Sequence, residues 1–227
     1  MATAKPKPKK KGAVAAARKK QPPWLWIGVA VLVLVLAVAA MVSSGGSDDG
    51  GGGSSAEGVE ETRTVSISGD ALPELPQSGS DPAVGKVIPE ATGQSFDGTP
   101  VAIRNDGRAK VILFVAHWCP HCRNEIPELA DWLKSNELPN GVDVYAVSTA
   151  VDSKRPNYPP SEWLKGEDWT APTLADSSDG KAAEAYGLSA FPYFVAVDGS
   201  GKVVARTSGE ITTGQFAELA QSALSNR

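Results

Sequence analysis

Short blocks of apolar and polar positions follow one another along residues 81–227 and predict alternating strands and helices. Residues 110–116 and 142–148 are apolar and rich in β-branched side chains, as buried strands are. Between them, one predicted helix face carries apolar residues at spacings of four, three and four: Cys122, Ile126, Leu129 and Leu133. A strand, a helix and a second strand in this order predict an α/β fold.

Shorter signals place further elements around this unit. Asp97-Gly98 indicates a hairpin turn between strands near residues 87–88 and 100–104. The other predicted elements, in chain order, are helices at 161–165 and 181–186, a hairpin of strands 193–197 and 202–206, and a final helix capped by Thr212 or Thr213. Residues 81–227 therefore have the size and the elements of one domain with its own core.

The N-terminal part has a different pattern, which predicts a membrane anchor. Residues 1–23 carry eight basic side chains and no acidic one, and residues 24–42 contain no charge. A helix of that length spans about 28 Å, close to the thickness of a bilayer core. Trp24 and Trp26 stand at the start of the apolar run, where interfacial aromatic residues are expected. Basic residues before the span predict a cytoplasmic N-terminus and an extracytoplasmic C-terminal domain at the cell membrane.

A cleaved signal peptide is the competing interpretation of this segment. Ala37-Val-Ala39 has the composition of a cleavage site. The apolar run is, however, longer than the roughly 7–15 residues of a signal-peptide core, which favours an uncleaved anchor. Either interpretation predicts that the remainder of the chain is exported.

Composition and charge separate the anchor from the domain. Residues 43–80 are rich in Gly, Ser and Pro and predict a flexible linker, although residues 62–68 alternate enough for a short strand. The chain beyond residue 23 contains 14 of the 22 basic residues and all 26 acidic residues, which gives this part a net charge of −12. This acidity favours solubility and argues against nucleic acid as a partner.

The candidate chemistry lies directly after the strand predicted at 110–116. Trp118 is followed by Cys119-Pro120-His121-Cys122, which contains the only two cysteines of the chain. Pro120 suits the first turn of a helix, so Cys119 is expected at a helix N-terminus, where the helix dipole favours a thiolate. Cys122, one turn further on, can close a disulfide with Cys119. This spacing predicts dithiol–disulfide exchange, with Cys119 attacking and Cys122 resolving the mixed disulfide.

Other uses of a Cys-x-x-Cys pair are zinc binding and an inert disulfide. A structural zinc site needs four ligands, and the only histidines, His117 and His121, lie too close to the cysteines for the usual spacing. Redox chemistry is therefore the favoured interpretation, and no metal site is predicted.

Two motifs resemble one family. Trp118-Cys-x-x-Cys followed by Glu125 and Pro127 resembles the thioredoxin fold, and in particular its TlpA/ResA-like extracytoplasmic branch. The segment from residue 185 to residue 199 is similar to the family's stretch around a cis-proline, here Pro192. The resemblance implies a central mixed sheet flanked by helices and a redox-active Cys119–Cys122 disulfide with no other cofactor.

The resemblance also implies partners and roles. It implies substrates among exported proteins with thiols or disulfides, a membrane electron donor or acceptor, and an acid–base role for Glu125 toward Cys122. The alternative for Glu125 is an ordinary surface glutamate. Classical thioredoxins carry a buried aspartate in the strand before the motif, but Leu113 occupies that position, so Glu125 or water must move the proton.

The remaining candidate site residues are assigned to redox tuning and the substrate groove: Trp118, Pro120, His121, Phe191 and Pro192. His121 is expected to favour the Cys119 thiolate, and this predicts a reduction potential above the thioredoxin value of about −270 mV. That expectation conflicts with the reductase direction implied by the resemblance. Phe191 is bulkier than the residue common before the cis-proline, and His117 is expected to be incidental.

The function favoured by the sequence is a membrane-tethered extracytoplasmic thiol-disulfide oxidoreductase. The main alternative is a copper-binding chaperone of thioredoxin fold, using Cys119, Cys122 and a histidine. Such carriers usually have wider cysteine spacing and a distant histidine, and no histidine follows His121. A structural disulfide would need no cis-proline, and a peroxidase is less consistent with a resolving cysteine inside the motif.

Overall fold

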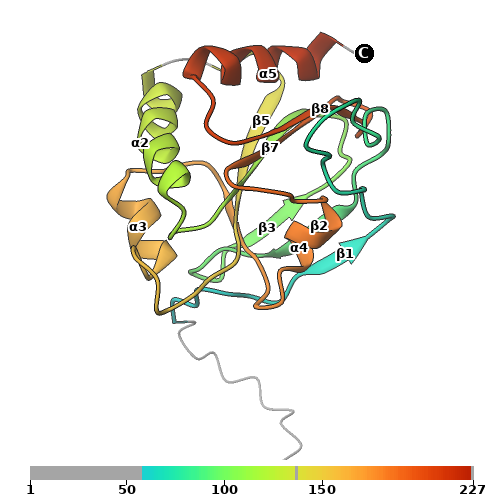
Figure 1. Cartoon of the computed structure of the whole chain (residues 1–227). Coiled ribbons are helices and arrows are strands. Elements are labelled where there is room, and N and C mark those ends of the chain that lie inside the picture. Colours follow the sequence, from blue (N-terminus) through green and yellow to red (C-terminus); the bar gives the residue numbers. More distant parts are fainter. Residues whose placement is uncertain (1–57, 136–137, 226–227) are drawn as a thin grey trace, which may run out of the picture. The chain divides into compact units, whose positions relative to one another are not determined.

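The computed structural model describes residues 58–135 and 138–225 (Figure 1). The helices are α2 (Pro120–Ser135), α3 (Pro160–Gly166), α4 (Lys181–Ala185) and α5 (Thr213–Ser225). The strands are β1 (Ser66–Ser68), β2 (Glu90–Gln94), β3 (Pro100–Ile103), β4 (Ala109–Val115), β5 (Val142–Ser148), β6 (Thr173–Ala175), β7 (Tyr193–Val197) and β8 (Val203–Ser208).

A five-stranded mixed sheet forms the centre of the domain, with strand order β6-β5-β4-β7-β8. β4 is parallel to β5 and antiparallel to β7, with Leu113 opposite both Ala146 and Phe194. Every residue of β4 is buried, which explains its unbroken apolar sequence. The predicted thioredoxin-like α/β fold with a mixed sheet is confirmed.

Successive β4 side chains enter two different cores because a strand points its side chains alternately to opposite faces. Val111, Leu113 and Val115 share a core with apolar residues of α2, α3 and α5. Ile112 and Phe114 share a second core with α4 and with a three-stranded antiparallel sheet, β1-β2-β3. β4 therefore ends between two packed layers, which fixes the start of α2 in space.

The domain begins earlier than the boundary at residue 81 that the composition suggested. β1 pairs with β2, and Val65 and Leu72 are buried. The amide of Leu72 donates to the carbonyl of Ala185 at 2.8 Å, and a Cβ on Gly187 would lie 2.3 Å from the carbonyl oxygen of Pro73. Within residues 58–80 the predicted flexible linker is therefore wrong, because backbone bonds and a few apolar anchors hold this stretch against α4.

The other predicted elements agree with the structure except in two places. The Asp97-Gly98 turn joins β2 to β3, but the strand before it lies at Glu90–Gln94 rather than at residues 87–88. Val87 instead makes an isolated bridge with Lys202. The edge strand β6 was not predicted, since only three residues pair with β5.

The predicted membrane anchor, residues 24–42, lies outside the described residues. In the part of the chain from residue 58 to residue 225, without 136 and 137, no helix is long and apolar enough to cross a bilayer.

Candidate active site

The dithiol lies where β4 turns into α2. The amide of Cys119 donates to the carbonyl of Ala116 at 3.0 Å, and Pro120 is the first residue of the helix. Both thiols are free in this structure, with Cys119 exposed by 5 % and Cys122 fully buried. Cys119 is therefore the outer sulfur at the helix N-terminus, the position that favours a thiolate and admits a second sulfur.

Cys122 lies on the core-facing side of α2. Burial raises the pKa of the Cys122 thiol well above its usual range, and the nearby Cys119 and Glu125 charges raise it further. A thiol in such surroundings stays protonated until a neighbouring base takes the proton. Cys119 lies at the helix N-terminus near the surface, whereas Cys122 is fully buried with a raised pKa. These two environments suit an attacking thiol and a resolving thiol, respectively.

Glu125 is buried, with an exposed fraction of 3 %, so the surface-glutamate alternative is wrong. Its Oε2 accepts a hydrogen bond of 2.9 Å from the amide of Ile211. Burial raises the pKa of Glu125 to about 7, assisted by the charges of Glu210 and Glu128 and opposed by the Ile211 amide. A carboxyl group that titrates near neutrality one helical turn from Cys122 is suited to exchange a proton with that thiol.

His121 points to the loop before α5. Its Nδ1 lies 2.6 Å from Oε1 of Glu210, and the same oxygen accepts from Nδ2 of Asn124 at 3.0 Å. These hydrogen bonds lower the pKa of Glu210. The positive charge that His121 would offer to Cys119 is thus opposed by a carboxylate, a feature that the sequence analysis missed because Glu210 lies 89 residues away.

The peptide bond between Phe191 and Pro192 is cis, as the resemblance implied. The carbonyl oxygen of Phe191 lies 3.9 Å from Sγ of Cys119, and the carbonyl of Pro192 accepts from the amide of Gly209 at 2.9 Å. Three successive residues therefore link the parts of the site: Gly209 contacts the cis-proline, Glu210 contacts His121, and Ile211 contacts Glu125.

The aromatic wall of the site consists of Trp118 and Phe191, whose rings meet edge to face at 5.8 Å. The indole Nε1 of Trp118 donates to the carbonyl of Ala150 at 2.7 Å, and the guanidinium of Arg155 lies 4.3 Å from the centre of the Trp118 ring. The sequence did not identify Arg155 as a site residue, because nothing in residues 150–157 indicates that this loop packs against Trp118 next to the dithiol.

His117 is not incidental, contrary to expectation. It is fully buried; Nδ1 lies 2.7 Å from the carbonyl oxygen of Pro156, and Nε2 accepts from the amide of Asp152 at 3.2 Å. Nδ2 of Asn157 donates to the His117 carbonyl at 3.0 Å. His117 therefore fixes the loop of residues 150–157 beside the active site.

The copper-binding alternative gains no support from this geometry. Both ring nitrogens of His117 are used by the loop, and Nδ1 of His121 is bound to Glu210. Among the described side chains, no three from His, Cys, Asp and Glu are grouped as metal ligands.

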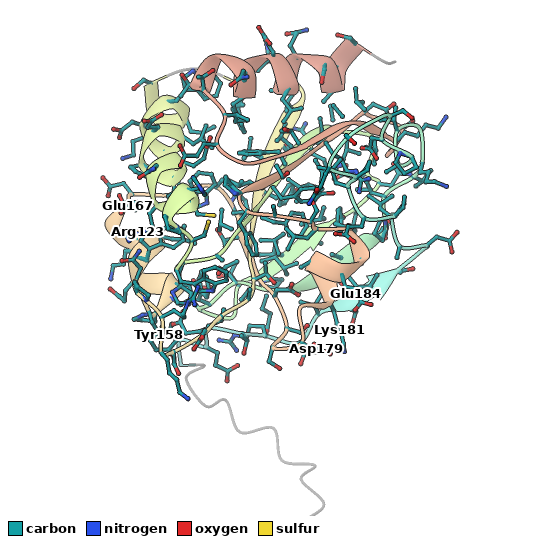
Figure 2. All side chains as sticks on the ribbon, in the orientation of Figure 1. Arg123, Tyr158, Glu167, Asp179, Lys181 and Glu184 are labelled. Atoms are coloured by element: carbon teal, nitrogen blue, oxygen red, sulfur yellow. The ribbon has the colours of Figure 1, made fainter. Side chains whose placement is uncertain are left out.

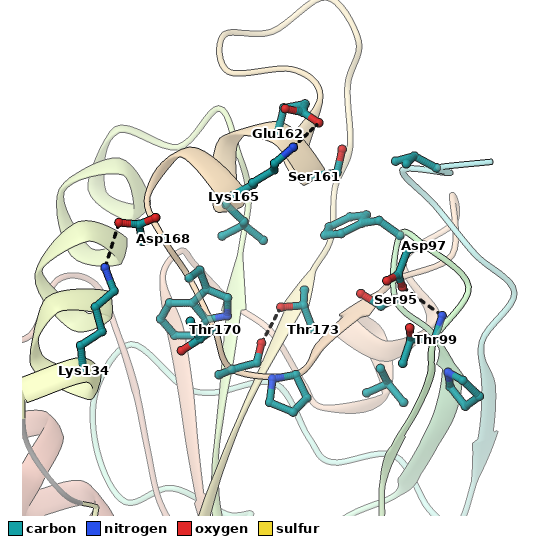
Figure 3. A pocket seen from close by; sticks show the side chains of 18 residues that line it. Ser95, Asp97, Thr99, Lys134, Ser161, Glu162, Lys165, Asp168, Thr170 and Thr173 are labelled. Atoms are coloured by element: carbon teal, nitrogen blue, oxygen red, sulfur yellow. Dashed lines mark hydrogen bonds and ion pairs between the residues drawn. The ribbon is translucent and has the colours of Figure 1, made fainter. Parts of the chain in front are cut away.

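A groove in the described part of the domain lies away from the dithiol. It has a volume of about 920 Å³ and is bounded by α3, the β2–β3 turn and the stretch before β6 (Figure 3). Lys134 pairs with Asp168 at its rim, at 3.0 Å. None of the predicted site residues lines it, so this groove is separate from the site around Cys119.

Comparison with known proteins shows the family of this chain. The family model described as AhpC/TSA matches residues 84–206, which is more than half of the chain. The chain belongs to the AhpC/TSA family. Within this family it is similar to the thiol:disulfide interchange protein DsbE homolog of Paracoccus denitrificans, 31% identical over 142 residues that cover 63% of this chain and 72% of the relative. The TlpA/ResA-like resemblance is confirmed, and this AhpC/TSA member is a thiol-disulfide oxidoreductase.

A more distant relative and two solved structures are also similar to this chain, and the structures show the same fold. Sporulation thiol-disulfide oxidoreductase A of Bacillus subtilis is 22% identical over 125 residues, 55% of this chain and 74% of that protein. A DsbF homologue from Corynebacterium diphtheriae has a similar fold, with a TM-score of 0.54 at 19% identity, covering 68% of this chain and 99% of that one. A thioredoxin-family thiol:disulfide interchange protein from Chlorobium tepidum has a TM-score of 0.51 at 24% identity, covering 61% and 96%.

Proposed function

We propose that this protein is held in the cell membrane by residues 24–42 and exchanges disulfides of exported proteins through Cys119 and Cys122. The observation that carries the exchange mechanism is the position of Glu125, buried one helical turn after the buried Cys122 and with a pKa raised to about 7 by burial. The basic residues before the span support the orientation, with the C-terminal domain outside the cytoplasm.

In the reductive direction, the Cys119 thiolate attacks one sulfur of a substrate disulfide. A bond forms between Cys119 and that sulfur, and the other substrate sulfur leaves as a thiolate. Glu125 then takes the proton of Cys122, and the resulting thiolate attacks Sγ of Cys119, which breaks the bond between Cys119 and the substrate sulfur. The two substrate thiolates take up one proton from Glu125 and one from solvent. The substrate leaves with two thiols, and the protein retains the Cys119–Cys122 disulfide; the oxidative direction is the reverse.

The site residues divide between these two steps. Trp118, Phe191 and Pro192 form the surface on which the substrate polypeptide lies next to Cys119. His121, opposed by Glu210, adjusts the stability of the thiolate, and Pro120 starts the helix whose N-terminus favours it.

Trapping of mixed disulfides tests this assignment. Cys122→Ser should accumulate substrates bound to Cys119, because the attack still occurs but resolution does not. Cys119→Ser is the matched control and should trap none; non-reducing gels followed by mass spectrometry identify the trapped proteins. Equal trapping by both variants would contradict the roles of the two cysteines, and trapping of cytoplasmic proteins alone in intact cells would contradict the exported substrates.

A further inference from the structure

Arg155 has an unusual position in this acidic chain. Its guanidinium lies over the ring of Trp118, the residue directly before Cys119. Among the ion pairs of the described residues none involves Arg155, and its side chain is exposed. The part of the chain after residue 23 has a net charge of −12, so an exposed and unpaired cation in contact with Trp118 is a candidate for binding an anion.

The loop that carries Arg155 is held in place by its backbone. The amide of Arg155 donates to the carbonyl of Asp152 at 3.0 Å, while Asp152 and Pro156 are both bound to the buried His117 ring. At the start of the loop, the carbonyl of Ala150 accepts from Trp118. Arg155 is therefore positioned before any partner arrives, which reduces the entropy lost on binding.

The contact between the Arg155 guanidinium and the Trp118 ring leaves the positive charge of Arg155 free to bind an anion. A guanidinium over an aromatic face interacts through its plane and keeps the N–H groups at its edge free to donate. These groups match the two oxygens of a carboxylate, which they can bind in a bidentate manner. The nearest acidic residue along the loop, Asp152, uses Oδ1 to accept from the amide of Lys154.

Two other side chains near the dithiol can carry positive charge: Arg123, which is exposed, and His121, which is hydrogen-bonded to Glu210. His121 lies two residues after Cys119, so a carboxylate is already present at that position. Tyr158 continues the loop on the same side of the domain as Arg123 (Figure 2). Near Cys119 the surface is thus apolar at Trp118 and Phe191, and Arg155 is the cation whose contact with this apolar part is established.

We propose that Arg155 is a specificity-determining residue that binds a carboxylate in the substrate polypeptide, close to the cysteine attacked by Cys119. This inference rests on the proposed function and names its substrate class: an extended segment with an acidic side chain near the target sulfur. Trp118 and Phe191 bind the adjoining apolar part of the segment. The domain's overall acidity disfavours acidic substrates elsewhere on its surface, so the selection is made at this residue.

The test uses the reduced full chain in detergent micelles and three peptides with the same intramolecular disulfide. The residues flanking the target cysteine are Glu in one peptide, Gln in the second and Lys in the third. Exchange converts each peptide disulfide to two thiols and the protein dithiol to its disulfide, so no further reductant is needed. The rate is measured by mass spectrometry after acid quenching, at about 20 mM and about 300 mM salt.

The wild-type chain should react about threefold to fivefold faster with the Glu peptide than with the Gln peptide at low salt, the effect of one exposed charge pair. Arg155→Glu should reverse the order so that the Lys peptide reacts fastest, and Arg155→Gln should abolish the preference. Lys154→Glu is the matched control, because it makes the same charge change one residue away without the Trp118 contact, and it should keep the wild-type order. At high salt the preference should shrink.

Equal wild-type rates for the three peptides would overturn the inference and leave the proposed function standing. Equal effects of Lys154→Glu and Arg155→Glu would also overturn the inference, because the preference would then depend on the net charge of the loop and not on a contact made by Arg155. A purely structural role of Arg155 would change all three rates by the same factor, which again excludes the inference. Absence of exchange with every peptide would overturn the proposed function itself.

Discussion

Replacing Glu125 by Gln should make the protein more stable at alkaline pH while it slows catalysis. Gln keeps a carbonyl oxygen that can accept the hydrogen bond from the Ile211 amide, and it removes the carboxyl group that ionises. The side chain is almost completely buried, so a negative charge at this position is costly in the folded protein. Activity and stability should therefore change in opposite directions.

The size of the stability effect follows from the pKa of Glu125. The value rises from 4.5 to about 7 on folding. At about 1.36 kcal/mol for each pKa unit, the difference of about 2.5 corresponds to about 3 kcal/mol. Because the folded state binds the proton more tightly than the unfolded state does, the stability of the wild type falls as pH rises from about 4.5 to about 7 and then levels off.

The assay is urea denaturation of both reduced proteins between pH 4 and pH 8. The free energy of unfolding of Glu125→Gln, relative to that of the wild type, should rise by about 3 kcal/mol across this interval, whatever the offset at pH 4. Resolution of a preformed mixed disulfide at pH 7 should be about a hundredfold slower, the lower end of what a general base contributes. Glu128→Gln is the control: it changes an exposed charge that raises the pKa of Glu125, so it should shift the stability curve slightly to lower pH and keep its shape.

Parallel stability curves for the wild type and Glu125→Gln would refute this reasoning. They would mean that the carboxyl group has the same proton affinity in the folded and unfolded states. Unchanged resolution at pH 7 would separately refute the role of Glu125 toward Cys122, even if the stability curves diverged.

Two other expectations follow from the charges at the site and in the N-terminal part. Glu210→Gln should raise the reduction potential by about 10–30 mV in a glutathione equilibrium, because a carboxylate no longer opposes positive charge on His121. The same change in a His121→Gly background should have no effect, and an equal effect there would exclude His121 as the intermediary. Protease added to cells stripped of their wall should digest the chain after residue 42 and leave the basic tail intact, whereas a protected C-terminus would contradict the proposed orientation.

Local sequence patterns were enough to predict the elements that carry the dithiol. The unbroken apolar run of β4, the proline after Cys119 and the apolar face of α2 are properties of neighbouring residues. The final helix was predicted in the same way: the amide of Gln215 donates to Oγ1 of Thr212 at 3.2 Å, a contact that spans three residues. The cis bond before Pro192 came from the family resemblance rather than from the physics of its sequence.

The tertiary structure decided the chemical state of the site. Whether Glu125 is a surface glutamate or a buried acid depends on Ile211, 86 residues away, and the charge near His121 depends on Glu210 in the same loop. The same holds for His117, which fixes a loop 35 to 40 residues further on, and for residues 58–80, whose Gly- and Pro-rich composition hides their contacts with α4. A local sequence determines periodicity and helix ends, but burial and charge pairing depend on which distant segments the fold brings together, and these set the proton affinities on which exchange depends.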